Sequence, residues 1–492
     1  MTHLVSIDPA RPIAPNDRTV FGGFAEQLGR CIYGGIYEPG SPLADDSGIR
    51  TDVLEALKRL RMPVIRYPGG NYVSGYRWRD GVGPREERQA RMDLAWHDLE
   101  PTTFGTNEFV DYCRRLGTEP YLAVNAGDGD MREARDWVEY ANGTTDTALV
   151  KLRKQHGYEA PHAVKYWGIG NEVDGPWQIG HKTPEEYART YTEFAKVMKW
   201  TDPSIRLLAA GVSLWAPNWV ERVQLLMEHA PKLIDYMAIH WYVGNNRERG
   251  YRDEDFASYM AISEKMDDML SGTAGILRAM SSAQKLGHDI PIAVDEWNVW
   301  YRVGNEGKLE EVYNLEDALV VAMHFNAFFR HAKSVKMANI AQIVNVIAPV
   351  MTRPDGLVLQ STFHPFELYA STAGDTALDV HWDGDTFATP EFAALRVLDV
   401  SATLDSAGKR LAVYLVNRSQ SETAETTVEL QRGRFADEGD LHVINGPDVK
   451  AANTFDTPDA VGVRSTRVAA GGTTLQLALE PHSVTALVID VV

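Results

Sequence analysis

The sequence predicts an α/β fold: a (β/α)8 TIM barrel followed by a C-terminal β-sandwich domain of the jelly-roll type. Three observations support this prediction. Short apolar runs alternate with amphipathic helical patterns up to about residue 350, and these runs number eight. The last quarter of the chain holds only short strand patterns separated by turns. The 492 residues are enough for a barrel and one further domain.

The eight expected barrel strands are mostly continuous runs of Val, Ile, Leu and Tyr rather than strict alternations. This pattern is typical of parallel strands that are buried on both faces. In chain order they are Val20–Phe24, Val64–Tyr67, Pro120–Asn125, Val164–Gly168, Arg206–Ala210, Tyr236–His240, Ile292–Val294 and Ile340–Val346.

Helical patterns lie between these strands. Thr106–Leu116, for example, begins with a Thr-Asn-Glu start signal and ends at Gly117. Strands interleaved with helices favour a closed barrel over an open doubly wound sheet. The other expected helices are Asp52–Leu60, Pro184–Lys199, Trp219–Glu228, Lys265–Leu286 and Tyr313–Lys333.

The C-terminal part changes character from about Leu378, where period-two alternation replaces the helical patterns. We expect the barrel to span residues 1–372 and the β-sandwich to span residues 373–492. The segment Thr2–Ile7 is also extended, and we expect these first 15 or so residues to add an edge strand to the sandwich. The expected sandwich strands are Ser401–Asp405, Arg410–Asn417, Thr426–Leu430, Thr474–Leu479 and Ser483–Asp490.

The composition excludes several classes of function. The net charge is −19, so the surface repels nucleic acid and anionic membranes and favours a neutral substrate. Two cysteines, Cys31 and Cys113, cannot form a disulfide framework, and no Cys/His cluster indicates zinc. Neither a signal peptide nor a membrane-spanning apolar run is visible, so we expect a cytoplasmic protein.

Two glutamates follow directly after expected barrel strands, where the functional residues of such barrels lie. Glu172 comes after the fourth strand in Gly170-Asn171-Glu172, and Glu296 comes after the seventh in Asp295-Glu296-Trp297. Cleavage of a glycosidic bond needs two such carboxyl groups, about 5–5.5 Å apart for retention or 6.5–9.5 Å for inversion. The pair predicts a glycoside hydrolase, a chemistry that needs no metal and no cofactor.

The two carboxyl groups require different environments. Glu172 must be protonated to act as an acid, and we expect burial and a nearby carboxylate to raise its pKa. Glu296 must be ionised, and Arg66 on the second strand is the expected cation, with Tyr242 as a further donor. Asn171 is placed to hold the 2-OH of the sugar.

The roles of the neighbouring residues are more open. His240 either contacts the substrate or is a satisfied structural group. Asp295 should point away from Glu296, because side chains alternate along a strand, and we expect it to be structural. Of four tryptophans we expect no more than two to stack on sugar and the rest to be core. These candidates for substrate contact are Trp96, Trp177, Trp297 and Trp300.

The ordered set of motifs resembles the α-L-arabinofuranosidases of glycoside hydrolase family 51. The resemblance covers roughly the first 350 residues, and the final strands around Leu479-Glu480-Pro481-His482-Ser483 are similar to that family's C-terminal domain. The matching segments are Gly23–Glu26, Arg66–Asn71, Glu100–Thr106, Gly168–Glu172, His240–Tyr242, Asp295–Asn298 and Gln342–Val346.

The resemblance implies a double displacement with Glu172 as the acid/base and Glu296 as the nucleophile, through a covalent arabinosyl-enzyme. It also implies a homo-oligomer, often a hexamer. The residues that it implies for the furanose subsite are Glu26, Asn71, Asn171, Tyr242 and Gln342.

We therefore expect an exo-acting enzyme that releases terminal α-L-arabinofuranosyl groups from arabino-oligosaccharides, arabinan or arabinoxylan fragments. Two alternatives remain: another retaining barrel glycosidase, such as a β-xylosidase or an endo-glucanase, and a carbohydrate-binding protein without turnover. The linkage preference stays open, because the loops 245–255 and 303–312 that would shape the outer subsites match no motif.

Overall fold

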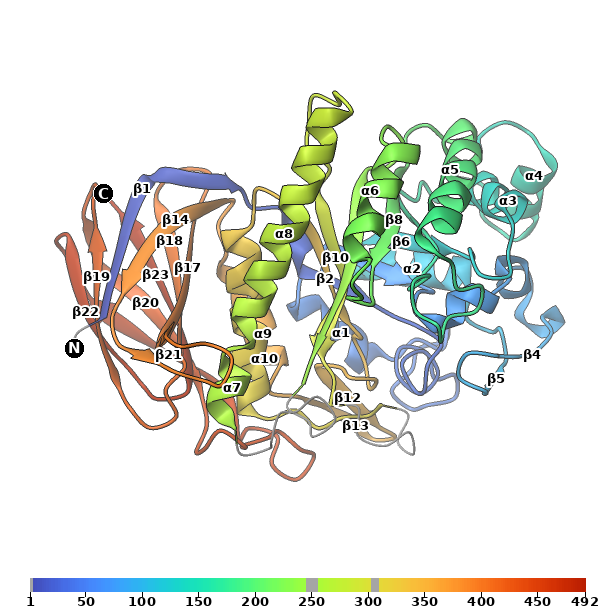
Figure 1. Ribbon diagram of the computed structural model, residues 1–492. Helices are drawn as coiled ribbons and strands as arrows, with labels where there is room; N and C mark the ends of the chain where they lie inside the picture. Colours follow the sequence, from blue (N-terminus) through green and yellow to red (C-terminus); the bar gives the residue numbers. More distant parts are fainter. Residues whose placement is uncertain (1–2, 245–254, 302–308) are drawn as a thin grey trace.

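The structure is a computed structural model that describes residues 3–244, 255–301 and 309–492. It has two parts, a barrel surrounded by helices and a C-terminal sheet domain at the left of Figure 1. The two loops left unassigned by the sequence, 245–255 and 303–312, lie largely outside the described residues.

Eight parallel strands close into the predicted barrel, in the order β10-β11-β2-β3-β6-β7-β8-β9. All of them are largely buried on both faces, which explains their continuous apolar sequences. They are β2 (Gly22–Phe24), β3 (Val64–Tyr67), β6 (Glu119–Val124), β7 (Tyr166–Ile169), β8 (Arg206–Val212), β9 (Tyr236–Val243), β10 (Ile292–Val299) and β11 (Val335–Ala341).

The prediction for the eighth strand was wrong in its position. The strand runs over Val335–Ala341, so Gln342 and Asn345 follow the strand instead of lying within it. The preceding helix ends at Arg330, and the chain needs only a short turn before it enters the barrel. The apolar run after Gln342 is buried as part of the rim and looks like a strand by composition alone.

The six expected helices are present with small shifts at their ends, and the described part of the chain holds four others that were not expected. The expected ones are α1 (Thr51–Arg59), α2 (Thr106–Leu116), α5 (Pro184–Thr201), α6 (Trp219–His229), α8 (Ile262–Ala283) and α9 (Leu315–Arg330). The others are α3 (Met131–Asn142), α4 (Ala148–Gln155), α7 (Phe256–Met260) and α10 (Phe363–Thr372). Short elements complete the barrel part: η1 (Arg18–Phe21), η2 (Asn71–Gly75), η3 (Trp78–Gly81), η4 (Arg85–Glu87), β4 (Arg91–Met92), β5 (Leu99–Glu100), β12 (Val350–Arg353) and β13 (Gly356–Leu359).

Helix α9 connects the two parts of the molecule. Every residue of α9 except Arg330 is buried, as expected for a helix that is covered on all sides. One side of α9 packs on β10 of the barrel, and another packs on the C-terminal sheet. Figure 1 shows α8, α9 and α10 between the barrel and the sheet domain.

The C-terminal domain is a nine-stranded sheet in the order β21-β20-β23-β18-β17-β14-β1-β19-β22. Its strands are β1 (His3–Pro15), β14 (Thr376–Asp383), β17 (Leu398–Leu404), β18 (Arg410–Asn417), β19 (Ala424–Leu430), β20 (Phe435–Asn445), β21 (Gly462–Ala469), β22 (Thr474–Leu479) and β23 (Ser483–Val491). The chain segment between β14 and β17 forms a small hairpin of two strands, β15 (Thr386–Phe387) and β16 (Leu395–Arg396).

The N-terminal strand β1 belongs to this sheet, where it pairs antiparallel with β14 and parallel with β19. It is therefore a central strand, and the expectation of an edge strand was wrong. Helix α10 ends at Thr372 and β14 begins at Thr376, and we propose that the boundary between the domains lies between them.

The C-terminal sheet curls around one apolar core, as the predicted sandwich requires. Val413 of β18 and Leu477 of β22 belong to the same buried cluster, although four other strands separate β18 from β22 in the sheet order. The fold class predicted from the sequence, a barrel followed by a mostly-sheet domain, is confirmed.

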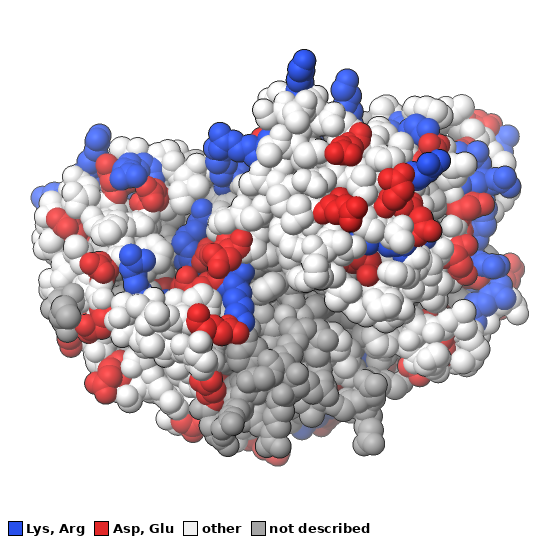
Figure 2. All heavy atoms as spheres, viewed as in Figure 1, with Lys and Arg blue, Asp and Glu red and all other residues white. Residues whose placement is uncertain are grey.

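Charged side chains of both signs are interspersed over the face seen in Figure 2, and no broad basic patch is visible there. Within the described residues, no helix combines the length and the apolar character needed to cross a lipid bilayer.

Candidate active site

A cavity of about 840 Å³ opens at the carboxyl ends of the barrel strands. Residues that follow seven of the eight strands contribute to its wall, as expected for an active site on this fold. Its lining includes Glu26, Asn71, Trp96, Glu172, Trp177, Trp215, His240, Trp241, Tyr242, Glu296, Trp300 and Gln342. We call it the catalytic cavity.

The two glutamates predicted to be catalytic face each other in this cavity. One carboxylate oxygen of Glu172, one of Glu296 and a ring nitrogen of His240 all lie within 4.8 Å of one another. Carboxyl groups of retaining glycosidases lie about 5–5.5 Å apart, whereas inverting enzymes leave room for a water at 6.5–9.5 Å. The spacing therefore allows direct attack on a sugar and leaves no space for a water between the two groups.

Glu296 is held as a carboxylate by two donors. Arg66 donates from Nη1 to Oε2 over 2.7 Å, and Tyr242 donates from its hydroxyl to Oε1, also over 2.7 Å. Burial disfavours the charge of Arg66, but the carboxylates of Asp295 and Glu296 outweigh it and raise the pKa of Arg66. The guanidinium also donates to Oδ1 of Asn171 over 2.6 Å, which ties the nucleophile candidate to the sugar-binding side.

Glu172 lies in a different environment, at the turn after β7, where its φ of 40° is in the left-handed region. Trp177 donates its indole N–H to Oε2 over 2.7 Å, and Nδ1 of His240 lies 2.9 Å from Oε1. Such a backbone conformation costs free energy and recurs at active sites. The turn aims the carboxyl group across the cavity.

The proton of this pair is placed on His240 rather than on Glu172. Burial lowers the pKa of His240, but the carboxylates of Glu296, Asp295 and Glu172 outweigh burial and raise it to about 10. For Glu172 burial raises the pKa, yet the hydrogen bond and charge of His240 together bring it below its ordinary value. The sequence-based expectation of a raised pKa for Glu172 was therefore wrong, because it did not include a charged histidine.

The expectation that Asp295 points away from the nucleophile was also wrong. Asp295 lies 3.5 Å from Nε of Arg66 and 3.4 Å from Nε2 of His240, and it accepts a hydrogen bond from Tyr121. The pairing of β10 with β9 shifts register between Ala293 and Glu296, so alternation is interrupted there. Both carboxylates consequently reach the same two cations.

Glu26 lines another part of the cavity wall, after β2. Its Oε1 accepts hydrogen bonds from the backbone N–H of Tyr72 (3.0 Å) and from the indole of Trp96 (2.8 Å), and Oε2 accepts from Nε2 of Gln342 (3.1 Å). Burial is the main cause that raises the pKa of Glu26 to about 8, against the hydrogen bonds that lower it. Below that pH Glu26 can carry a proton and donate to a sugar hydroxyl.

The Gly69-Gly70 turn brings the backbone close to the carboxyl group of Glu26. Gly70 has a φ of 59°, and a Cβ atom there would lie 2.1 Å from the carboxyl group of Glu26. The turn places Asn71 on the cavity wall, where its backbone carbonyl also accepts from Gln178. Only glycine allows this approach of the backbone to the carboxylate.

We expect Gly70→Ala to lower kcat/KM by about tenfold to a hundredfold, mainly through KM, because Glu26 must move. A buried polar group left without its hydrogen-bond partner costs about 1–3 kcal/mol, and a decade of rate corresponds to about 1.4 kcal/mol. Steady-state kinetics on an aryl arabinofuranoside measures the loss. Gly275→Ala on α8, where a Cβ meets nothing within 4 Å, is the matched control and should leave KM unchanged.

The tryptophans separate into cavity and core. Trp96 and Trp177 line the cavity, but Trp297 is buried against α9, with its ring stacked on His324 at 5.5 Å. The prediction that Trp297 contacts substrate was wrong, because the side chain of the residue after Glu296 turns outward from the barrel. Trp300, another of the four candidates, also lines the cavity. Trp215 and Trp241 line it as well, although the sequence had not indicated them as substrate-contacting residues.

Glu172, His240 and Glu296 are also the group of donors, within the described residues, that comes nearest to a metal-binding arrangement. Arg66 places a full positive charge 2.7 Å from Glu296, and His240 is itself cationic. Both features oppose a bound cation and favour an arrangement that holds a proton.

Two family models match the chain. The model of the α-L-arabinofuranosidase 1 domain matches residues 56–255, and that of the α-L-arabinofuranosidase C-terminal domain matches residues 295–483. The chain is 38% identical to intracellular exo-α-(1→5)-L-arabinofuranosidase 1 of Bacillus subtilis, with 92% of each chain covered. It is 40% identical to α-L-arabinofuranosidase C of Emericella nidulans, over 95% of this chain and 94% of that one.

Solved structures are similar over the whole length. The arabinose complex of the α-L-arabinofuranosidase from Thermotoga maritima superposes with a TM-score of 0.92 at 35% identity, with 100% of both chains covered. The family 51 enzyme from Thermotoga petrophila gives a TM-score of 0.91 at 36% identity, over 99% of this chain and 100% of that one. The resemblance stated from the sequence is confirmed. The chain belongs to the α-L-arabinofuranosidases of glycoside hydrolase family 51.

Proposed function

We propose that this glycoside hydrolase is an exo-acting, retaining α-L-arabinofuranosidase that removes terminal non-reducing α-L-arabinofuranosyl groups. The observation that carries the proposal is the spacing of the two carboxylates, with oxygens of Glu172 and Glu296 within 4.8 Å. Proton NMR of the first sugar released from an aryl arabinofuranoside tests it. Retention requires that the α-anomer forms first and the β-anomer appears only by mutarotation.

The first half-reaction forms a glycosyl ester. An Oε of Glu296 attacks the anomeric carbon, and the bond from that carbon to the leaving oxygen breaks. Glu172 takes the proton from His240 across their 2.9 Å contact and gives it to the leaving oxygen. Arg66 and Tyr242 hold Glu296 in place through one hydrogen bond to each oxygen. Because the nucleophile is already oriented, less entropy is lost on reaching the transition state, and the activation free energy is lower.

The second half-reaction hydrolyses the ester. A water loses its proton to Glu172 and attacks the anomeric carbon from the side that the leaving group vacated, and Glu296 departs as a carboxylate. Two inversions at one carbon give net retention. The proton that Glu172 accepts is the one that it can pass to His240 across the 2.9 Å contact.

His240 makes the reaction tolerant of alkaline pH. Its pKa of about 10 means that the Glu172–His240 pair keeps its proton up to that pH and loses it above. In His240→Gln the cation that lowers the pKa of Glu172 is gone and burial remains, so Glu172 alone must hold the proton. We expect the alkaline limb of kcat/KM to move to lower pH by about one unit or more.

A pH profile of kcat/KM between pH 5 and 11 for both forms measures this shift. Coincident alkaline limbs would show that His240 does not hold the proton used in the reaction. Glutamine keeps a donor near Glu172, so a loss of geometry alone would lower the whole profile without moving it.

The glycone side of the cavity presents polar side chains that can bind hydroxyl groups. Glu26, Asn71 and Gln342 line it, and Oε1 of Gln342 is buried without a hydrogen bond partner among the described residues. Asn171 is buried behind this wall, where its Oδ1 accepts a hydrogen bond from Arg66. We assign these groups to the hydroxyls of a terminal arabinofuranose. Sites that hydrogen-bond hydroxyls discriminate strongly against sugars that lack them at the matching positions.

We propose arabino-oligosaccharides with α-(1→5) links as the substrates, because the similar Bacillus subtilis enzyme is named for that bond. Exo action predicts arabinose and a chain shortened by one unit as the first products. A panel of aryl arabinofuranoside, xyloside and glucoside separates this proposal from a β-xylosidase or an endo-glucanase.

We further propose a cytoplasmic homo-oligomer, a hexamer by resemblance. Two bacterial relatives are named as intracellular, which supports the first part. Light scattering on the purified chain tests the second, and a monomeric mass would contradict it.

A further inference from the structure

The first turns of helix α8 contribute to the wall of the catalytic cavity. Ile262, the first residue of α8, and Lys265 both line the cavity. Residues three apart in a helix share a face, so this face of α8 is turned to the cavity. The helix follows β9, which carries His240 and Tyr242.

The neighbouring face of the same turns is bound to the C-terminal domain. Oε1 of Glu264 lies 3.1 Å from Nη1 of Arg418, which directly follows β18. Arg418 is almost completely buried, and it also donates to the backbone carbonyl of Arg396 in the small hairpin. Glu264 and Asp267 are again three residues apart, so they form one stripe.

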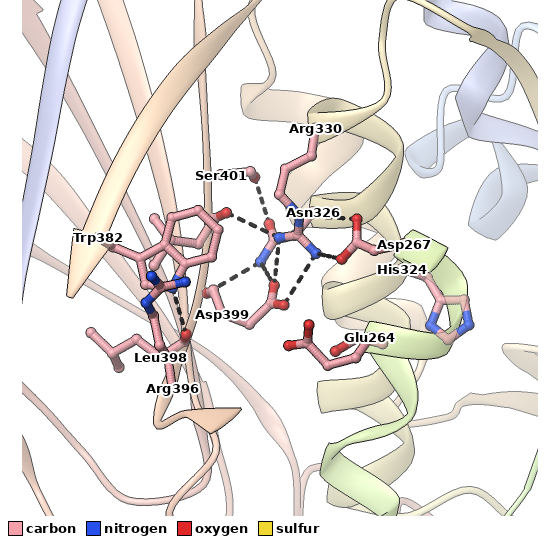
Figure 3. Close-up of polar contacts among 12 residues, drawn as sticks. Glu264, Asp267, His324, Asn326, Arg330, Trp382, Arg396, Leu398, Asp399 and Ser401 are labelled. Atoms are coloured by element: carbon pink, nitrogen blue, oxygen red, sulfur yellow. Dashed lines mark hydrogen bonds and ion pairs between the residues drawn. The ribbon is translucent and has the colours of Figure 1, made fainter. Parts of the chain in front are cut away.

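Asp267 is connected to the sheet through Arg330 of α9. Arg330 donates to Asp267 over 2.5 Å and to Asp399 of β17 over 3.1 Å, and it lies between them in Figure 3. Asn326 donates to Asp399 as well, over 2.7 Å. Figure 2 shows basic and acidic side chains close together along this boundary.

Lys265 connects the face of α8 that lines the cavity with the C-terminal domain. Its ammonium lies 2.5 Å from Oε2 of Glu391, which stands in the hairpin between β15 and β16 of the C-terminal domain. Lys265 is therefore a cavity-lining side chain with its charged end fixed by the other domain. Ion pairs of this exposure contribute little to folding stability, about 1 kcal/mol or less, so their effect is on position.

The barrel order shows which end of the cavity α8 borders. Glu26, Asn71 and Gln342 follow β2, β3 and β11, which are neighbours in the closed barrel. Trp215 follows β8 and Trp241 belongs to β9, on the far side of the barrel from β2. The catalytic glutamates, from β7 and β10, lie between these two groups. The glycone side and the α8 side are thus at opposite ends.

We propose that the C-terminal sheet domain sets the specificity for the leaving group, by holding Lys265 and the first turns of α8 against the end of the cavity that receives the rest of the oligosaccharide. Glu264 and Glu391 are then positioning residues that act through α8. This inference rests on the proposed function, because it needs a sugar cleaved between Glu172 and Glu296.

The double variant Glu264→Gln/Glu391→Gln tests it, since the changes remove the charge of the two ion pairs at the first turns of α8 and alter no cavity residue, while the contact of Asp267 with Arg330 stays in place. For α-(1→5)-linked arabinotriose we expect KM to rise about three- to fivefold with kcat nearly unchanged. For an aryl arabinofuranoside, which does not extend to α8, kcat/KM should stay within a factor of two. Glu438→Gln, which breaks an exposed ion pair elsewhere in the sheet domain, is the matched control.

Salt provides a second readout. At an ionic strength of 1 M the screening length falls to about 3 Å, close to the separation of these charge pairs, so raising salt to 1 M should raise KM for arabinotriose in the unaltered protein but not in the double variant. Equal changes for both substrates, or no change for arabinotriose, would overturn the inference. Failure of the unaltered protein to hydrolyse the aryl arabinofuranoside would instead refute the proposed function. Thermal unfolding of all forms should coincide within a few degrees.

Discussion

Glu296→Ala is expected to lower kcat by about 10⁴-fold or more, which corresponds to at least about 5 kcal/mol of lost transition-state stabilisation. Without Glu296 no covalent ester can form, and Arg66 and Tyr242 have no nucleophile to orient. The measurement is steady-state hydrolysis of an aryl arabinofuranoside. Substantial residual activity would remove Glu296 from the mechanism.

Azide distinguishes a lost nucleophile from a damaged fold. The small anion fits the space left by the carboxylate, attacks the anomeric carbon once and should give an arabinosyl azide of inverted configuration. Glu296→Gln provides the structural control, because its amide keeps the contact with Tyr242 and cannot attack. Both variants should bind arabinose and unfold in a single transition.

The sequence was sufficient to predict the fold and to bring the two glutamates proposed as catalytic into one cavity. Each follows a buried parallel strand, and the carboxyl ends of such strands meet at one rim, so chain order alone brings Glu172 and Glu296 together. Glu26 and Arg66 were predictable for the same reason. In the pairing of β10 with β9, Glu296 lies directly beside His240. This contact could not be predicted from the positions of the strand ends alone.

What the sequence did not reveal depends on local irregularity and on contacts between distant elements. The register shift before Glu296 turned Asp295 inward, and a period-two argument assumes that no such shift exists. Trp297 has the composition of a sugar platform, yet its contacts are with α9, which is distant in sequence.

The proton balance of the site could not be derived from residue types. Three carboxylates, Glu172, Asp295 and Glu296, surround two cations, Arg66 and His240. Whether the acid or the histidine holds the proton depends on distances of 3–4 Å, which only the folded chain determines. A sequence that names all five residues is compatible with either distribution.

Glu172→Ala is expected to slow the hydrolysis of two substrates unequally, because their leaving groups differ in their need for a proton. This inequality identifies Glu172 as the acid/base. For arabinotriose, whose leaving oxygen needs a proton, kcat/KM should fall by about 10²–10⁴-fold, the usual contribution of general acid catalysis. For an aryl arabinofuranoside with an acidic phenol, the first step needs no proton, so kcat/KM should fall far less. The second step is still slowed, because no base activates the water, and a burst of phenol should precede the slow turnover.

Azide again gives the decisive result, now with the opposite stereochemistry. It needs no base, so it should accelerate turnover of the aryl substrate by Glu172→Ala and yield an arabinosyl azide of retained configuration, since Glu296 has already inverted the carbon once. Trp177→Phe is the matched control, because it removes the 2.7 Å hydrogen bond to Glu172 and leaves the carboxyl group in place. If the two leaving groups lose rate equally in Glu172→Ala, Glu172 is not the proton donor. The histidine that shares its proton, 2.9 Å away, would then have to be tested in that role.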